Sequence, residues 1–343
     1  MSKIRVRGEA IRHYILEHLD KHPADIMKVT SEHFDVTRQA VNKHLASLVH
    51  EEAIIPSGNT RSRTYRLAPL MTWRQDYTLS SGLAEDAVWR KDIEAKLGQV
   101  PSNVLDIWHY GFTEMFNNAI DHSGGTAISV NVEKTAVSTR ITIDDNGVGI
   151  FKKIQTQLGL LDERHAVLEL AKGKLTTDPA RHSGEGIFFT SRMFDDFRIV
   201  SGGVHFSHQF GDKEDWIWEH DGDLNGTTVW MKLNNHTART LKKVFDEYTS
   251  GDDYGFNKTI VPVKLAQYGD SKLVSRSEAK RLLARIDRFK TVLLDFSDIE
   301  SVGQAFADEI FRVFANAHPE MELIELHACP EVQQMIQRAR SHV

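Results

Sequence analysis

The chain is 343 residues long, which predicts two or three domains. With 41% hydrophobic and 26% charged residues, its composition is that of a globular protein rather than a disordered or fibrous one. An apolar run of about 18 residues and an apolar N-terminal signal are both missing, so we expect a cytoplasmic protein without a membrane span. A single cysteine excludes an internal disulfide, and neither Cys-x-x-Cys nor His-Glu-x-x-His spacing occurs to hold zinc.

Basic residues are concentrated at the start of the chain. Residues 1–70 contain 11 lysines and arginines against 8 aspartates and glutamates, a net charge of +3, whereas the whole chain has a net charge of −6. This distribution indicates that only the N-terminal part meets a polyanion.

The first 70 residues have the apolar spacing of three helices followed by a hairpin. Helices are predicted at 8–21, in a short segment after Pro23 that buries Ile26, Val29 and Phe34, and at 35–50. Two strand-like segments then flank a basic turn. This order resembles the winged helix-turn-helix domain of prokaryotic regulators. The resemblance implies that the third helix enters the major groove of double-stranded DNA and that the hairpin contacts the backbone.

Side chains at the outward positions of the third helix are of the types that hydrogen-bond base edges and phosphates. By the resemblance, the DNA-binding residues are Thr37, Arg38, Gln39, Asn42 and Lys43 of the helix with Arg61 and Arg63 of the hairpin. Since winged-helix proteins commonly bind two half-sites, we expect a homodimer. The alternative is a winged helix that serves only protein contacts or dimerisation.

Residues 71–100 are predicted to be a helical connector, with one helix at 84–97 that ends before Pro101. A second helix is predicted in Phe112-Thr-Glu-Met-Phe-Asn-Asn-Ala-Ile-Asp-His-Ser123. Because Glu114 and Asn118 are four residues apart, they lie on one face of that helix. A carboxylate and an amide oxygen placed in this way could steer a water and bind a hard cation such as Mg²⁺.

Three glycine-containing motifs follow this helix. Asp145 ends a strand-like run and leads into a turn with Gly147 and Gly149, which allow backbone to approach a ligand closely. Later, Gly184 and Gly186 precede an apolar run, and the N–H groups that open a helix bind anions. The third motif is Gly226-Thr-Thr-Val-Trp230. Taken singly, each motif is typical of an ordinary loop, and no P-loop sequence occurs.

In this order the four motifs resemble the N, G1, G2 and G3 boxes of the GHKL ATPase superfamily, whose Bergerat-type domain is an α/β sandwich. The resemblance covers residues 100 to 233 and implies that ATP and Mg²⁺ bind there. It implies that Glu114 polarises the attacking water or hydroxyl, that Asn118 ligates Mg²⁺ and that Asp145 accepts the adenine amino group. The other nucleotide-binding residues it implies are Gly147, Gly149, Gly184, Gly186, Ile187, Thr227 and Thr228.

The stretch between Ile150 and His182 is predicted to be irregular, and its position matches the ATP lid of that superfamily. Lys172, Lys174 and Arg181 are predicted to form a solvated basic surface there, with phosphate contact as the alternative.

Residues 234–255 are predicted to be a linker that includes a charged helix. Beyond them the pattern is α/β, with a buried strand at 292–296 between helices at 277–289 and 306–314. This part resembles a STAS-like domain, the group that includes the anti-sigma-factor antagonists. The serine that accepts phosphate in the antagonists falls near Ala305 here, so phosphorylation of the chain's own domain is not expected.

The predicted fold class is therefore multidomain α+β. Its parts are a winged helix (1–70), a helical connector (71–100), a Bergerat-type ATPase domain (101–233), a linker (234–255) and a STAS-like α/β domain (256–343). We expect an ATP-responsive transcriptional regulator, with ATPase activity open and a protein partner for the STAS-like domain. The first alternative is a serine/threonine protein kinase of the anti-sigma-factor type that acts on a separate protein. The second is a nucleotide-independent scaffold.

Overall fold

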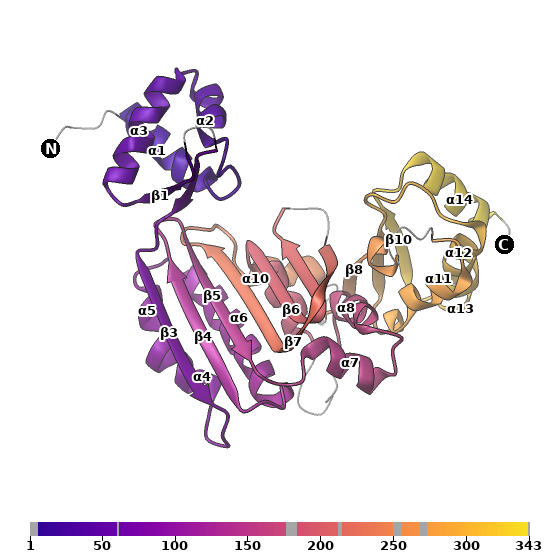
Figure 1. Cartoon of the computed structure of the whole chain (residues 1–343). Helices are drawn as coiled ribbons and strands as arrows, with labels where there is room; N and C mark the ends of the chain where they lie inside the picture. Colours follow the sequence, from indigo (N-terminus) through magenta and orange to yellow (C-terminus); the bar gives the residue numbers. More distant parts are fainter. Residues whose placement is uncertain are drawn as a thin grey trace. The chain divides into compact units, whose positions relative to one another are not determined.

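The computed structural model describes residues 6–59, 62–175, 184–211, 215–249, 256–267 and 273–341 (Figure 1). The chain separates into two compact units. The first unit comprises residues 1–74, 131–141 and 233–237, and the second comprises 75–130, 142–232 and 238–343. In the part of the chain that the structure describes, no helix has the length and apolar character needed to cross a membrane.

The N-terminal part contains the three helices and the hairpin that the sequence predicts. The elements are α1 (Val6–His18), α2 (Ile26–Phe34), α3 (Arg38–His50), β1 (Ile54–Ser57) and β2 (Thr64–Leu67). Strands β1 and β2 pair in antiparallel fashion. The Thr37 side chain caps α3 by accepting a hydrogen bond of 3.2 Å from the Ala40 amide, which satisfies one of the free N–H groups at the helix start.

One apolar core holds these elements together. It is formed by Ile11, Ile15, Leu19, Ile26, Val41, Leu45, Leu48, Ile54, Tyr65 and Leu67. Of the three α2 residues predicted to be buried, only Ile26 is. Val29 and Phe34 are half-buried, and Phe34 packs against the edge of this core. Val137, from the turn between two strands of the central sheet, packs against the same core.

The central sheet has five strands in the order β3-β4-β5-β7-β6. Their bounds are β3 (Met71–Thr78), β4 (Ala127–Lys134), β5 (Ser138–Asp145), β6 (Asp196–Gln209) and β7 (Asp215–Asn234). The prediction of a helical connector is wrong for residues 71–78, which form the edge strand β3. Met71, Trp73 and Tyr77 are half-buried and lie on one side of the strand, where the alternation is interrupted by the exposed Gln75. The helix predicted at 84–97 is present as α4 (Glu85–Val88), a π-helical turn (Trp89–Ile93) and α5 (Glu94–Leu97).

Helices α6 (Ser102–His122) and α10 (Leu241–Tyr248) lie behind the sheet in Figure 1, and α9 (Gly186–Met193) packs against both. The predicted linker therefore includes a packed helix, because Val244 and Tyr248 of α10 are buried. Tyr248 meets the ring of Phe188 edge-on, with 5.0 Å between the ring centroids.

The stretch after residue 150, predicted to be irregular, contains two helices. These are α7 (Ile150–Leu158) and α8 (Glu163–Lys172), and the Asp162 side chain caps α8 by accepting from the His165 amide at 2.9 Å. Every residue of α8 from Ala166 to Lys172 is buried. Glu169 and Lys172, which share one face of α8 with His165, are among these buried residues, so the polar face of this helix is covered by protein instead of by water.

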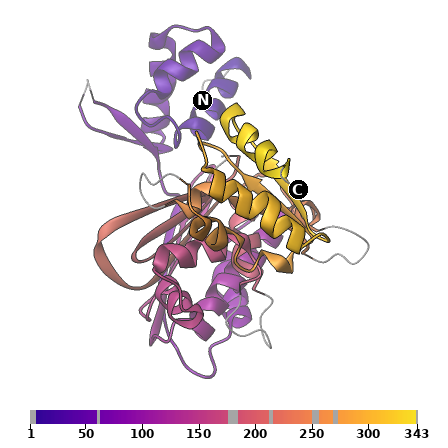
Figure 2. The same ribbon diagram turned by 90° about the vertical axis from the view of Figure 1, so that its right-hand side faces the viewer.

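The C-terminal part is a three-stranded parallel sheet covered by helices (Figure 2). Its strands, in the order β10-β9-β8, are β8 (Lys258–Pro262), β9 (Thr291–Asp295) and β10 (Glu322–Leu326). Its helices are α11 (Arg276–Leu283), α12 (Gln304–Asp308), α13 (Ala315–Ala317) and α14 (Pro330–Arg340), with 3₁₀ turns at Val263–Ala266 and Ile286–Arg288 and a π-helical turn at Glu309–Phe314. The predicted strand and both predicted helices are thus present, and a capping box of Ser275 and Glu278 starts α11.

A buried ion pair joins the end of α9 to the antiparallel hairpin of β6 and β7. Arg192 donates to Asp215 at 3.1 Å, and the other carboxylate oxygen of Asp215 lies 2.5 Å from Nδ1 of His208. Burial opposes ionisation of Asp215, but the charges of Arg192 and His208 outweigh it and lower the pKa of Asp215 to about 2. By contrast, the pair between Arg198 and Asp196 on β6 is partly exposed.

We expect Asp215→Ala to lower the free energy of unfolding by about 3–5 kcal/mol, because it leaves the Arg192 charge buried without its partner. Asp196→Ala is the matched control, since it removes a carboxylate from an exposed arginine pair and should cost less than about 1 kcal/mol. Urea unfolding followed by circular dichroism measures both. Equal losses in the two variants would contradict this account.

Candidate functional site

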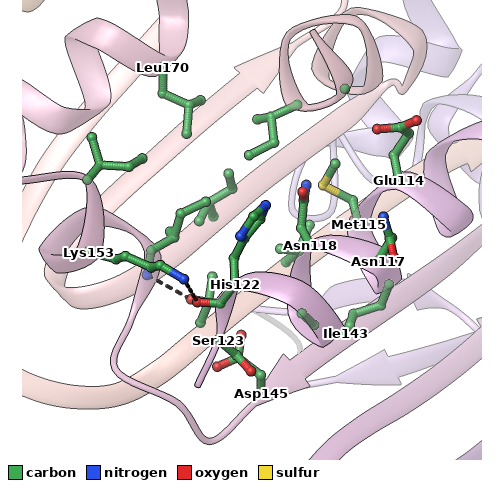
Figure 3. Close-up of a pocket in the computed structure, with 18 of the residues that line it drawn as sticks. Glu114, Met115, Asn117, Asn118, His122, Ser123, Ile143, Asp145, Lys153 and Leu170 are labelled. Atoms are coloured by element: carbon green, nitrogen blue, oxygen red, sulfur yellow. Dashed lines mark hydrogen bonds between the residues drawn. The ribbon is translucent and has the colours of Figure 1, made fainter. Parts of the chain in front are cut away.

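A pocket of about 350 Å³ lies between α6 and the central sheet, with α7, α8 and the start of α9 around it. Figure 3 shows its labelled residues, which come from α6, from the strand β5 and from α7 and α8. Its apolar lining includes Met115, Ile143, Ile150, Ile154, Leu170, Leu175, Ile199 and Val229. A smaller number of polar side chains lie among these apolar residues, and each is positioned by the helix, strand or turn that carries it.

Helix α6 presents Glu114, Asn118 and His122 to the pocket at intervals of one turn. The residues on the other face of α6, Phe112 and Phe116 among them, are buried in the core. This division of α6 into a core face and a pocket face is what the four-residue spacing of Glu114 and Asn118 predicts. Figure 3 shows all three polar side chains projecting from the same helix.

Asp145 ends β5 at the floor of the pocket. One of its carboxylate oxygens accepts a 2.9 Å hydrogen bond from the Gly147 amide. Burial raises the pKa of Asp145, and the hydrogen bonds from Gly147 and Thr227 oppose that shift only in part. A Cβ atom at Gly147 would overlap the Ser123 carbonyl, so the turn after Asp145 has room only for glycine.

The second glycine motif brings the start of α9 against α6. A Cβ atom at Gly186 would overlap the Glu114 carboxylate, so a larger residue there would have to push the Glu114 side chain out of its present position. The backbone of α9 therefore passes directly beside Glu114. Burial raises the pKa of the neighbouring Glu185, while Lys174 opposes the shift.

Lys153 of α7 is the lysine of the pocket lining. Its Nζ donates a 2.7 Å hydrogen bond to the His122 carbonyl at the end of α6, as Figure 3 shows. Burial lowers the pKa of Lys153. The sequence analysis missed Lys153, together with Asn117 and Ser123. Apolar residues at Ile150 and Ile154 mark one face of α7, and this spacing could have placed Lys153 beside them.

The structure brings most of the predicted nucleotide-site residues into this one pocket. Those that line it are Glu114, Asn118, Asp145, Gly184, Gly186, Ile187 and Thr227. Gly147 and Gly149 form the adjoining turn rather than the lining. Thr228 does not line the pocket, because its hydroxyl donates to Asp144 at 2.7 Å. The Thr227 hydroxyl accepts from the Ile150 amide at 3.0 Å and so fastens the start of α7.

The basic surface predicted at Lys172, Lys174 and Arg181 is not found for the two lysines. Lys172 is buried, and its Nζ donates to Glu169 at 2.7 Å. The Nζ of Lys174 donates to the Arg288 carbonyl at 2.8 Å. Lys172 is therefore removed from solvent, whereas Lys174 is half-buried and binds a protein carbonyl. Arg181 lies outside the described residues.

The predicted DNA-binding residues of α3 lie on its exposed face. Thr37, Arg38, Gln39, Asn42 and Lys43 are all exposed, and so is Arg63 next to β2. Arg61 lies outside the described residues. The Thr37 hydroxyl already serves as the α3 cap, so its first role is structural.

No group of three or more histidine, cysteine, aspartate or glutamate side chains that could hold a metal ion occurs among the residues described. A cation at Asn118 would therefore take most of its ligands from a bound molecule or from water.

Comparison with known proteins identifies one part of the chain. Residues 278–328 match the family described as a STAS-like domain of unknown function (DUF4325), which confirms the STAS-like prediction for that range. No curated protein matches the chain. Among solved structures, an IcIR transcriptional regulator from Alicyclobacillus acidocaldarius aligns at 14% identity, covering 71% of this chain and 94% of its own, with a TM-score of 0.21. A TM-score that low does not support an inference about fold or function.

We expect Asp145→Asn to increase the free energy of unfolding at pH 7. The folded state raises the pKa of this carboxyl, so its charged form costs stability at neutral pH, and the cost disappears as the pH falls below about 4. Asparagine keeps the oxygen that accepts from Gly147. Thermal melting at several pH values between 7 and 4.5 should show a gain that shrinks with acidification. Asp144→Asn is the control and should bring no gain; a less stable Asp145→Asn protein at pH 7 would contradict the burial argument.

Proposed function

We propose that this chain is a DNA-binding regulator that responds to ATP. ATP with Mg²⁺ binds in the pocket beside α6, and residues 1–70, folded as a winged helix, bind double-stranded DNA. One observation carries the proposal: seven of the residues implied by four separate motifs, from Glu114 to Thr227, line a single pocket. A Bergerat-type ATPase domain is the fold that this arrangement supports.

The floor of the pocket suits an adenine ring. Apolar side chains such as Ile143, Ile154 and Val229 can cover the faces of a flat heterocycle. Asp145 adds one carboxylate among them, and a carboxylate accepts hydrogen bonds from an exocyclic amino group. Selection for adenine over guanine follows, since guanine presents a carbonyl oxygen at the corresponding position of the ring.

The charges in the pocket explain why the nucleotide would bind as its magnesium complex. Glu114 and Asp145 are acidic, while Lys153 is the basic residue of the lining. A bare triphosphate would be repelled by the carboxylates. Mg²⁺ prefers oxygen ligands and would be held by the Asn118 amide oxygen together with phosphate oxygens. When bound, ATP·Mg²⁺ would supply the phosphoanhydride bond, and Glu114 would accept a proton from an attacking water.

The exposed face of α3 supports DNA binding by the N-terminal part. Arg38, Gln39 and Asn42 present donors and acceptors suited to base edges in the major groove, and Lys43 adds positive charge. Arg63 in the hairpin would bind a phosphate. A homodimer would place two such faces on two half-sites. A partner protein would bind through the STAS-like domain.

Incubation with γ-labelled ATP and Mg²⁺ separates a switch from a kinase. We expect the label to appear only as free phosphate, and Asn118→Ala to abolish its release because the cation loses its protein ligand. Label on a protein band in a cell extract, lost in Asn118→Ala, would instead make the chain a serine/threonine protein kinase.

Asp145→Asn should weaken ATP binding about 10–100-fold, because it removes a hydrogen bond to a charged group. Unchanged affinity in that variant would remove the proposed adenine contact.

DNA binding is tested on a duplex that the full chain selects from a random pool. Asn42→Ala should cost about 1–3 kcal/mol on the selected site and relax its sequence preference. Arg63→Ala should weaken binding to every duplex and reduce the slope of affinity against salt by about one. Lys28→Ala, on the exposed side of α2, is the charge-matched control and should leave both quantities unchanged. Fluorescence anisotropy at a series of salt concentrations provides the affinities. Equal losses in Arg63→Ala and Lys28→Ala would indicate a nonspecific charge effect, and an Asn42→Ala protein with unchanged sequence preference would contradict base contact by α3.

A further inference from the structure

Helix α8 contacts both the pocket and the C-terminal part of the chain. Leu170 of α8 and Leu175 just after it line the pocket beside α6. The same helix packs against β8 and against the 3₁₀ turn at Val263–Ala266 of the C-terminal part. The pocket and the C-terminal part both lie within the second compact unit. The position of α8, and with it one wall of the pocket, therefore depends on the C-terminal part.

Lys172 makes the central polar contact between them. Its side chain is 2% exposed, and its Nζ donates to the carbonyls of Arg281 at 3.1 Å and Ala284 at 2.9 Å. These carbonyls belong to the last turn of α11 and its C-cap, where carbonyl groups have no partner inside the helix. Lys172 thus caps α11 from another part of the chain, and its ammonium group loses these two carbonyl partners if α11 undocks.

Glu169 completes a buried charge network across the same contact. One oxygen accepts from Lys172 at 2.7 Å and the other from Arg285 at 3.2 Å. The Thr259 hydroxyl of β8 adds a 2.7 Å hydrogen bond to the Lys172 carbonyl. Since Glu169 and Lys172 are both buried, separation of the C-terminal part would leave their charges without Arg285 and the α11 carbonyls.

A row of aromatic rings forms a second connection. Phe188 lines the pocket and lies 4.7 Å from Phe256, whose ring lies 5.2 Å from Phe289, measured between ring centroids. Lys174 reaches across to Phe289, with its Nζ 4.7 Å from the ring centroid. The residues on both sides of the glycine turn at Gly173 therefore contact the C-terminal part.

We propose that the C-terminal domain regulates the nucleotide pocket of the same chain by docking on α8. The docked domain holds Leu170 and Leu175 in the pocket wall, so that nucleotide binding and docking stabilise each other. The identity of the ligand rests on the proposed function, whereas the docking contacts do not. Linkage makes the effect reciprocal: a protein that binds the α11 end and β8 in place of α8 lowers nucleotide affinity, and bound nucleotide excludes that protein.

The test compares two lysine substitutions in the full chain. Lys172→Met removes the buried ammonium group and keeps the length of the side chain, and Lys152→Met removes an exposed lysine of α7 that does not line the pocket. Affinity for a non-hydrolysable ATP analogue with Mg²⁺ is measured by titration calorimetry. We expect Lys172→Met to bind about tenfold more weakly than the natural chain, within the usual range of coupling between sites, and Lys152→Met to bind equally well.

Hydrogen exchange at the α8 and α11 amides reports docking directly. The analogue should slow exchange at α11 in the natural chain, although α11 itself does not line the pocket, and this slowing should be absent in Lys172→Met. If circular dichroism shows that Lys172→Met is unfolded, Arg285→Gln replaces it, because the Arg285 side chain is 31% exposed and its loss is milder.

The outcomes separate the two proposals. Analogue binding that is equal in the natural chain and the folded α8-contact variant, with no slowing at α11, overturns the docking inference and leaves the proposed function standing. A natural chain that does not bind the analogue overturns the proposed function, and the regulatory inference falls with it.

Discussion

Helix α6 contributes one face to the core and the other to the pocket, and its orientation is the constraint on which the rest of the structure depends. Its core face carries large side chains such as Trp108 and Phe112 that have no exposed surface. Its other face carries Glu114 and Asn118. Helix α6 cannot rotate about its axis without exposing apolar area or burying a carboxylate against the sheet. Each buried aromatic side chain contributes about 1.5–3 kcal/mol to keeping the helix in its orientation. The turn at Gly147 has room beside the Ser123 carbonyl, at the end of α6, only because the orientation of the helix is fixed.

The parts of the site that could be predicted from the sequence are those set by local geometry. Glu114 and Asn118 share a helix face by spacing alone, and the turn after Asp145 is marked by its glycines. Other parts depend on contacts distant in the chain. Lys172 was expected in solvent because lysine usually is, yet its partners in α11 lie more than 100 residues away. Likewise, Glu169 and Lys172 lie on the polar face of α8, and that face is buried by residues more than 100 positions further along the chain.

Secondary structure shows the same division. Helices with one apolar face, such as α3, were predicted at their observed positions because each needs only one neighbour. Strand β3 was missed, since Trp73 and Tyr77 carry a two-residue alternation too short to distinguish from a loop without its sheet partner β4. The electrostatics of the site could not be predicted from the sequence either, because the raised pKa of Asp145 arises from burial by elements before and after it in the chain.

The buried charges of α8 have a consequence for how the chain can be divided. The family match begins at residue 278, and β8, with the Thr259 hydroxyl that reaches Lys172, lies upstream of it. A fragment that ends before β8 would keep every residue of the pocket lining yet uncover the face of α8 that carries Glu169 and Lys172. Those two charges would lose their contacts with Arg285, the α11 carbonyls and Thr259. The limits of the family match and the limits of independent folding therefore fall at different places in this chain, and an excised pocket would lack the contacts that hold α8 in its wall.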